Sequence, residues 1–146
     1  MGLRLTKEAD YAIRAMIHIA CIPEESIALS RDIVRVHNIP SSFAAKILRR
    51  LVKAGLLVAT RGTNGGFALA RPAGAITLLH VVEAIEGPLR VTDCTTEPCG
   101  CGYAGECAAQ PVWQSIQSKI AELLDDATLE TLVSSPHRRG REAGVR

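Results

Sequence analysis

Apolar residues recur every three or four positions through the first third of the chain, which is the spacing of helices with one buried face. Polar capping residues, proline and glycine interrupt this pattern at regular intervals. Three helices are therefore expected, from Thr6 as N-cap to Pro23, from Ser30 as N-cap to about 37, and from Ser41 or Ser42 as N-cap to about 54, where Gly55 provides a left-handed end. Their inward-facing residues are expected to be Ala9, Ile13, Met16, Ile17, Ala20, Ile33, Val34, Val36, Phe43, Ile47, Leu48 and Leu51.

Two short apolar runs follow, separated by a glycine-rich turn. Residues 56–60 and 67–70 have the length and composition of strands, and residues 61–66 read Arg-Gly-Thr-Asn-Gly-Gly. This order predicts a β-hairpin. Two helices joined by a tight turn and followed directly by a hairpin are typical of a winged helix-turn-helix, so we expect a mainly α fold with a small β-hairpin wing.

The second half of the chain predicts two more helices and a final turn. Residues 72–75 form a linker, Thr77 caps a helix that runs to Glu86, and residues 128–133 are expected to form a last helical turn. Between them lies a heptad seam on a long helix, which predicts pairing with the same helix of a second subunit; packing on the winged domain is the alternative. The seam consists of Ala109, Trp113, Ile116, Ile120, Leu123 and Ala127.

Charge divides the chain into three parts. Residues 1–72 carry 11 Lys/Arg against 5 Asp/Glu, residues 73–134 carry 2 against 9, and residues 135–146 carry 4 against 1. The basic first part predicts a polyanionic partner for that part alone. No apolar run approaches bilayer length and the chain opens without an apolar signal segment, so no membrane partner and a cytoplasmic location are expected.

Basic residues concentrate on the third helix and the wing. The alternative to a binding role is a solvated helix face, but the helix-turn-helix, the wing and the charge split together favour double-stranded DNA. The candidate DNA-binding residues are Ser41, Ser42, Lys46, Arg49, Arg50, Lys53, Arg61 and Asn64. The expected domains are 1–75 for DNA binding, 76–107 for a linking helix and cysteine loop, 108–133 for dimerisation, and 134–146 for a disordered basic tail.

Four of the five cysteines lie within residues 94–107, among glycines and without helix or strand periodicity. A loop rich in soft thiolate ligands predicts a metal or iron–sulfur site. Zinc fits poorly because the spacings are uneven and no histidine lies between Glu83 and Ser135. A reducing compartment disfavours disulfides, while redox-active thiols or an empty loop stay open as alternatives. Cys21, at the end of the first helix, is expected to be a small core residue.

Several motifs resemble the Rrf-type winged-helix regulators, with the IscR and NsrR branches nearest. They are Arg-Leu-Thr-Lys-Glu-Ala-Asp-Tyr-Ala-Ile-Arg at 4–14, Gly-Leu at 55–56, the wing sequence at 61–67, and the late cysteine loop followed by Trp113. The resemblance implies a homodimer that binds a palindromic operator. It also implies a cluster held by three loop cysteines and a fourth ligand.

Carried onto this sequence, the resemblance implies that Cys94, Cys101 and Cys107 are the cysteine ligands and that Asp10 of the other subunit is the fourth. Cys99 could replace Cys101, or all four cysteines could ligate one cluster and leave Asp10 free. Ala108, Ala109 and Gln110 stand where 2Fe–2S members carry a histidine, which favours 4Fe–4S over 2Fe–2S.

The expected function is therefore a homodimeric, DNA-binding transcriptional regulator, a repressor, controlled by an iron–sulfur cluster that senses nitric oxide, redox state or iron supply. The alternative is a metal-free thiol-switch regulator that responds by disulfide formation. No base–nucleophile pattern occurs and the histidines are scattered, so neither an enzyme nor a small-molecule substrate is expected.

Overall fold

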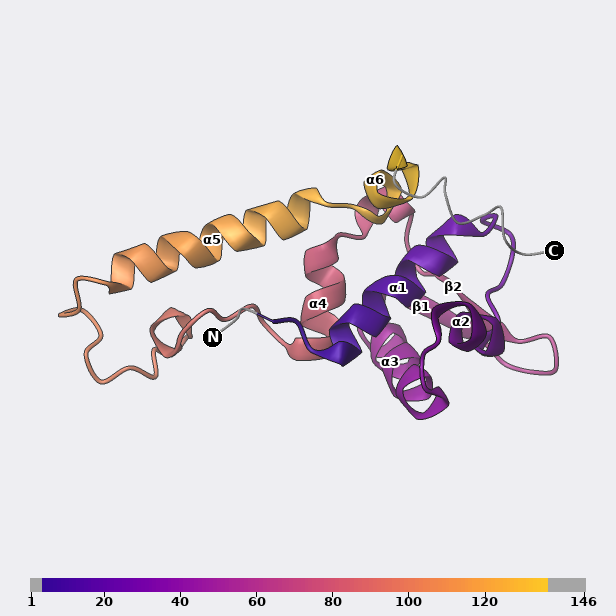
Figure 1. Ribbon diagram of the computed structural model, residues 1–146, viewed down its shortest axis with the longest axis horizontal. Coiled ribbons are helices and arrows are strands. Elements are labelled where there is room, and N and C mark those ends of the chain that lie inside the picture. The colour runs from indigo at the N-terminus through magenta and orange to yellow at the C-terminus, as the bar shows by residue number, and fades with distance from the viewer. Residues whose placement is uncertain (1–3, 137–146) are drawn as a thin grey trace.

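The computed structural model describes residues 4–136, and in this range the chain is mainly helical with one two-stranded hairpin (Figure 1). The predicted fold class, a winged helix-turn-helix followed by a long late helix, is confirmed. The helices are α1 (Lys7–Cys21), α2 (Ser30–His37), α3 (Ser41–Lys53), α4 (Leu78–Glu86), α5 (Gln110–Asp126) and α6 (Leu129–Ser134). The strands are β1 (Leu57–Thr60) and β2 (Gly66–Leu69), and single 3-10 turns occur at η1 (Ala73–Ala75) and η2 (Asp93–Thr95).

Three of the predicted helix ends are confirmed by their local hydrogen bonds or backbone angles. The Thr6 hydroxyl accepts a hydrogen bond from the backbone N–H of Ala9, and the Thr77 hydroxyl accepts one from that of His80. Gly55 follows α3 with a φ of 73°, a left-handed conformation that glycine adopts without a Cβ clash.

The predicted serine caps of α2 and α3 are wrong. Ser30 is the first residue of α2 rather than its cap, and α3 begins at Ser41 directly after Pro40, with no side-chain cap at either helix. The ring of Pro40 fixes its φ near −57°, so the chain enters the helix one residue early. Ser41 and Ser42 therefore lie exposed in the first turn of α3.

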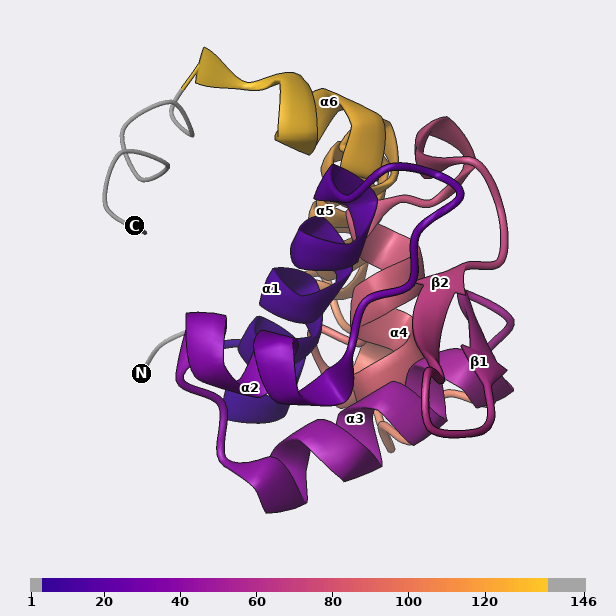
Figure 2. The same ribbon diagram turned by 90° about the vertical axis from the view of Figure 1, so that its right-hand side faces the viewer.

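The core is aliphatic and lies among α1, α3 and α4, which pack side by side (Figure 2). It contains Met16, Ile33, Leu51, Leu56 and Ile76, each fully buried. The predicted inward faces of α1 and α3 are largely confirmed, since residues of both stripes are buried or pack partly buried against this cluster.

Two predicted core residues are exposed instead. Val36 is 57% exposed, because His37 takes the inward position in the last turn of α2. Cys21 is also exposed, whereas Ile19 beside it on α1 is buried. The last turn of a helix buries only the residue that faces the core. That residue is His37 in α2 and Ile19 in α1, so Val36 and Cys21 face solvent.

The hairpin is antiparallel and pairs Leu57 with Leu69 and Thr60 with Gly66. Ala28 adds a short third segment, because its N–H and C=O exchange hydrogen bonds of 2.8 and 2.9 Å with Phe67. A Cβ on Gly66 would lie 2.5 Å from the Ala28 carbonyl oxygen, so glycine permits this close approach. The wing extends from the body of the molecule beyond this attachment (Figure 1).

Helix α5 lies at the other end of the molecule, apart from the three-helix core (Figure 1). It packs on α4 and η2, yet none of its 17 residues is buried. The chain returns to the core after α5, where the N–H of Leu78 donates to the Ala127 carbonyl and the N–H of Leu129 donates to the Ile76 carbonyl. The predicted last helical turn is α6, which packs on α1.

Of the predicted tail at 134–146, Ser134 ends α6 and residues 137–146 lie outside the described residues. Among the helices of residues 4–136, none combines the length and apolar character needed to cross a membrane.

A pair of histidines joins α1 to α2. His37 Nε2 lies 3.2 Å from His18 Nδ1, so one ring donates a hydrogen bond to the other, and the rings meet edge to face. Burial lowers the pKa of His37, and the charges of His18 and Arg14 lower it further. The folded state therefore favours the neutral form of the His37 ring.

This pair makes stability depend on pH. The folded state of His37 binds protons more weakly than the unfolded chain, whose histidine pKa is near 6.5. Its contribution is therefore fully present above that pH and is lost as the pH falls through and below it. Urea unfolding between about pH 5 and 8 is expected to lose more stability on acidification in the wild type than in His37→Gln. Parallel pH profiles for the two proteins would contradict this.

Candidate functional site

The outer face of α3 is polar and basic. Its inner face buries Ala44, Ile47, Leu48 and Leu51, so residues on the opposite side of the helix meet solvent. Five of the predicted DNA-binding residues are exposed there, with helical spacing that places them along one face. These are Ser41, Ser42, Lys46, Arg49 and Lys53.

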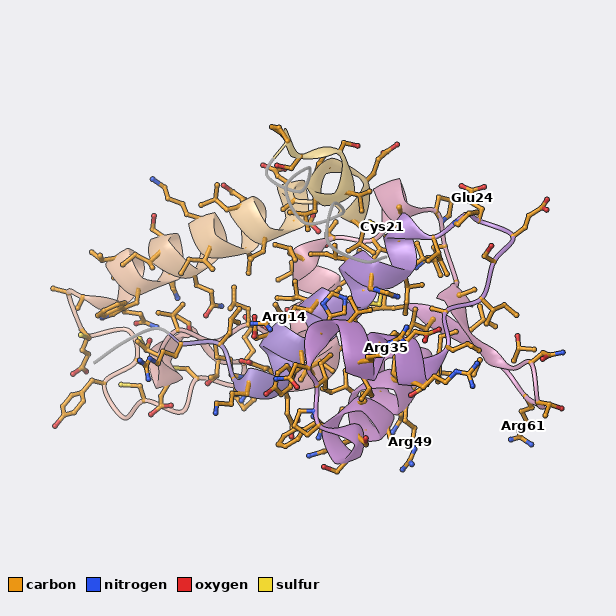
Figure 3. The ribbon with its side chains drawn as sticks, turned by 45° about the vertical axis from the view of Figure 1, so that its right-hand side comes forward. Arg14, Cys21, Glu24, Arg35, Arg49 and Arg61 are labelled. Atoms are coloured by element: carbon orange, nitrogen blue, oxygen red, sulfur yellow. The ribbon has the colours of Figure 1, made fainter. Side chains whose placement is uncertain are left out.

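The wing brings two further predicted residues to the surface. Arg61 and Asn64 lie in the exposed turn between β1 and β2. Figure 3 shows that Arg49 of α3 and Arg61 of the wing point outward at the same end of the molecule, away from α5. The structure thus gathers the basic residues of two separate segments on one side.

Two of the α3 cations are held by an acidic residue that sequence analysis did not single out. Lys46 Nζ lies 2.8 Å from Glu8 Oε1, and Arg50 Nη1 lies 3.0 Å from Glu8 Oε2. Arg50 Nη1 also donates to the Ile85 carbonyl oxygen at 3.1 Å. The hydrogen bond from Lys46 lowers the pKa of Glu8. Glu8 is 38 and 42 residues away from these partners, so no local spacing could have predicted the contacts.

The cysteine loop, residues 94–107, lies at the opposite end of the molecule and runs from η2 to the start of α5 (Figure 1). All four of its cysteines are free thiols; Cys94, Cys99 and Cys101 are half-buried and Cys107 is exposed. Cys94 Sγ lies 2.9 Å from Thr92 Oγ1, and Cys99 Sγ lies 3.7 Å from the Cys94 carbonyl oxygen.

Cys94 and Cys99 line one cavity of about 560 Å³ between the loop and the polar face of α5. Gln117 of α5 closes one side: its Oε1 accepts from the N–H of Val91, and its Nε2 donates to the Thr95 carbonyl oxygen. The start of the loop is therefore tied to the helix.

The loop provides the donors that an iron–sulfur cluster needs: four free thiols in a glycine-containing segment that can wrap closely. Within residues 4–136, however, no three histidine, cysteine, aspartate or glutamate side chains converge as a metal site. The donor chemistry fits the group, and the loop would have to close around it.

Asp10 lies in the first turn of α1 and is not part of such a group in the described single chain. Its Oδ2 lies 2.7 Å from Arg14 Nη2, one helical turn along α1, and the two form an ion pair. Both side chains are 49% exposed. The carboxylate is therefore accessible to a second subunit.

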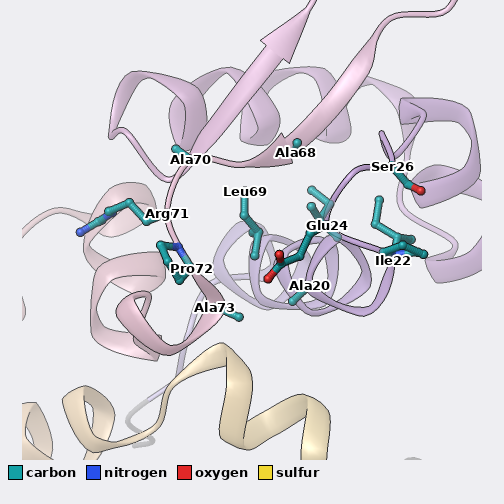
Figure 4. Close-up of a pocket in the computed structure, with 12 residues that line it drawn as sticks. Ala20, Ile22, Glu24, Ser26, Ala68, Leu69, Ala70, Arg71, Pro72 and Ala73 are labelled. Atoms are coloured by element: carbon teal, nitrogen blue, oxygen red, sulfur yellow. The ribbon is translucent and has the colours of Figure 1, made fainter.

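A separate pocket of about 350 Å³ lies between the end of α1 and β2 (Figure 4). Ile19, Ile22 and Leu69 give it an apolar lining, and Glu24 and Arg71 add charged groups. None of the predicted site residues lines this pocket. It is thus distinct from both the basic face and the cysteine loop.

Comparison with known proteins places these features in a family. A family model described as Rrf2, iron-dependent transcriptional regulator, matches residues 5–135. The structure of CymR, the global cysteine regulator of B. subtilis, is 27% identical, with a TM-score of 0.73 and coverage of 91% of this chain and 98% of that one.

Two further structures share the fold. IscR of T. potens is 24% identical with a TM-score of 0.74, covering 100% of this chain and 94% of its own. A putative transcriptional regulator from Listeria innocua is 21% identical with a TM-score of 0.77, covering 100% and 96%.

Proposed function

Since the chain belongs to the Rrf2 family of transcriptional regulators, which bind DNA and typically act as dimers, we propose that it is a homodimeric repressor controlled by an iron–sulfur cluster. Members of this family are regulators rather than enzymes. The operator bound by this protein is a palindrome, because a dimer with twofold symmetry contacts two equivalent half-sites.

The observation that carries the proposal is the separation of two sites on one chain. A basic face formed by α3 and the wing lies at one end, and a loop with four free thiols lies at the other. The first has the charge to bind phosphates, and the second has the donors to bind iron. Residues 1–75 would thus read DNA and residues 76–133 would sense and dimerise.

In the DNA complex α3 enters the major groove. Ser41, Ser42 and Lys46 approach base edges, because they lie in the first half of the helix, where recognition helices contact bases. Arg49 and Lys53 hold phosphates farther along α3, and the wing adds Arg61 and Asn64. Arg50 is already bonded to Glu8 of α1 and to Ile85 of α4, so it holds α3 against these two helices.

The second subunit packs on α5. Gln114 and Gln117 line the cavity beside the loop, so one polar side of α5 faces the chain's own cysteine loop. Val112 is 58% exposed and Leu123 is 72% exposed on the other side. An amphipathic helix with an unpartnered apolar stripe is stabilised by a matching stripe, which a second copy provides.

Thiolates of Cys94, Cys101 and Cys107 would hold the cluster, with Asp10 of the partner subunit as fourth ligand and Cys99 as the alternative to Cys101. The proposed cluster is 4Fe–4S, and when bound it would supply sensitivity to nitric oxide, oxygen or loss of iron. Ligation by Asp10 would join the first turn of α1 to the partner's loop. Since α1 packs on α3, this link would connect the cysteine loop of one subunit to the DNA-binding helix α3 of the other.

A second candidate, a metal-free thiol switch, is favoured by one observation: Cys94 and Cys99 line the same cavity, where oxidation could join neighbouring thiols. CymR of B. subtilis, described as a global cysteine regulator, has the same fold. Anaerobically purified protein that is colourless and lacks iron and acid-labile sulfide would favour this candidate over the cluster.

Substitution at the basic face tests the DNA-binding part of the proposal. Arg49→Ala is expected to reduce the slope of log affinity against log salt by about one, because one phosphate contact is lost. Lys119→Ala removes an equal charge from α5 and should leave the slope unchanged. The measurement is duplex binding over a salt series. Equal slopes for wild type and Arg49→Ala would contradict this assignment.

A further inference from the structure

Glu8 forms ion pairs with two basic residues of α3, the helix proposed to enter the major groove, and so competes with DNA for them. Glu8 lies on α1, outside the expected DNA-contacting surface, yet it binds Lys46 on the outer face of α3. We propose that Glu8 is a specificity-determining residue, which competes with DNA phosphates for Lys46 and so weakens binding to non-operator sequences. This inference rests on the proposed reading of DNA by α3.

The two cations around Glu8 are not equivalent. Arg50 is bonded both to Glu8 Oε2 and to the Ile85 carbonyl oxygen, so two contacts hold it against the protein. Within residues 4–136, Lys46 forms one hydrogen bond, to Glu8 Oε1 at 2.8 Å, and its side chain is 52% exposed. Arg50 therefore anchors the carboxylate, whereas Lys46 can exchange it for another anion.

Glu8 itself is held in place by the start of α1. The N–H and the hydroxyl of Thr6 both donate to Glu86 Oε1 of α4, at 2.8 and 2.9 Å. Thr6 also caps α1, through the Ala9 N–H. The first turn of α1 is thus fixed to α4, and the Glu8 side chain is only 23% exposed. The carboxylate would stay beside α3 when DNA arrives.

The Glu8–Lys46 ion pair disfavours a phosphate contact of Lys46 more than it disfavours a specific contact to a base. A phosphate that recruits Lys46 must first replace a carboxylate at hydrogen-bond distance, so little is gained on DNA of arbitrary sequence. A guanine at the correct position offers Lys46 the O6 and N7 acceptors together, which can repay the lost ion pair. Glu8 would therefore lower non-specific affinity and raise the ratio of operator to non-specific binding.

The test uses the full-length protein and a mixed-sequence duplex of about 30 base pairs, long enough for two reading helices. Glu8→Gln is expected to bind this duplex about two- to fivefold more tightly, the range of an exposed ion pair. Its salt slope should steepen by about one, because Lys46 becomes available to a phosphate. Glu24→Gln, which removes the same charge from the exposed turn after α1, is the matched control and should change neither quantity as much.

A double-mutant cycle with Lys46→Gln identifies the partner. In the Lys46→Gln background, Glu8→Gln is expected to have no effect beyond that of Glu24→Gln. The proposal is overturned if Glu8→Gln matches Glu24→Gln in the wild-type background, if it weakens binding, or if its effect persists without Lys46. Wild-type protein that binds no duplex at low salt would instead overturn the DNA-reading role of α3, and with it this inference.

Discussion

Replacing Cys94, Cys101 and Cys107 together by serine is expected to remove iron and acid-labile sulfide from anaerobically purified protein. Serine offers a hard hydroxyl oxygen in place of a soft thiolate, so the cluster loses its cysteine ligands. Operator affinity should then be fixed at the cluster-free value. If cluster and DNA sites are coupled by about 1–3 kcal/mol, that value differs from the loaded one by roughly 5- to 150-fold.

Single substitutions separate the ligands from their neighbours. Cys21→Ser is the matched control, because Cys21 is an exposed thiol on α1, outside the loop. Cys99→Ser is expected to keep the cluster; if it loses the cluster and Cys101→Ser keeps it, Cys99 is the second ligand. Asp10→Ala with an unaltered absorption spectrum and cluster lifetime would remove Asp10 from the site. Retention of full iron and sulfide by the triple variant would contradict the cysteine assignment altogether.

The second large effect is expected at α5. Leu123 is 72% exposed in the single chain, so an aspartate there leaves the folded subunit almost undisturbed. In a dimer the same carboxylate would be buried without a partner in an apolar seam, which is strongly unfavourable. Leu123→Asp is therefore expected to be monomeric by light scattering. Its DNA affinity should fall by about 100-fold or more, because two linked reading helices are replaced by one.

Ser115→Asp provides the control for this prediction. It places the same charge on an exposed position of α5 outside the predicted apolar seam, and it should leave the dimer intact. A Leu123→Asp protein that is as dimeric as Ser115→Asp would show that the apolar stripe of α5 is not the subunit contact.

Local sequence signals predicted much of the fold. The Thr6 and Thr77 caps, the left-handed Gly55 and the hairpin of the wing each depend on residues a few positions apart. The same short-range rules failed where a neighbour competed for the position. Pro40 moved the start of α3 ahead of the serines, and His37 took the inward place expected for Val36.

The candidate sites were predictable in composition but not in arrangement. Helical spacing correctly placed Lys46 and Arg49 on the exposed face of α3. It could not reveal that Glu8 holds Lys46, since that contact joins residues far apart in the chain. Nor does cysteine spacing determine where four thiols lie in a loop without regular structure, and a ligand from a second subunit is invisible to any analysis of one chain.

The central claim is that a cluster held by the cysteine loop governs how two α3 helices meet a duplex. The most direct test is the affinity of one anaerobic wild-type preparation for a palindromic operator selected from random sequence, measured before and after removal of its cluster, with iron and sulfide counted in both states. The account predicts a change of roughly 5- to 150-fold. Equal affinities in the loaded and cluster-free states would contradict it.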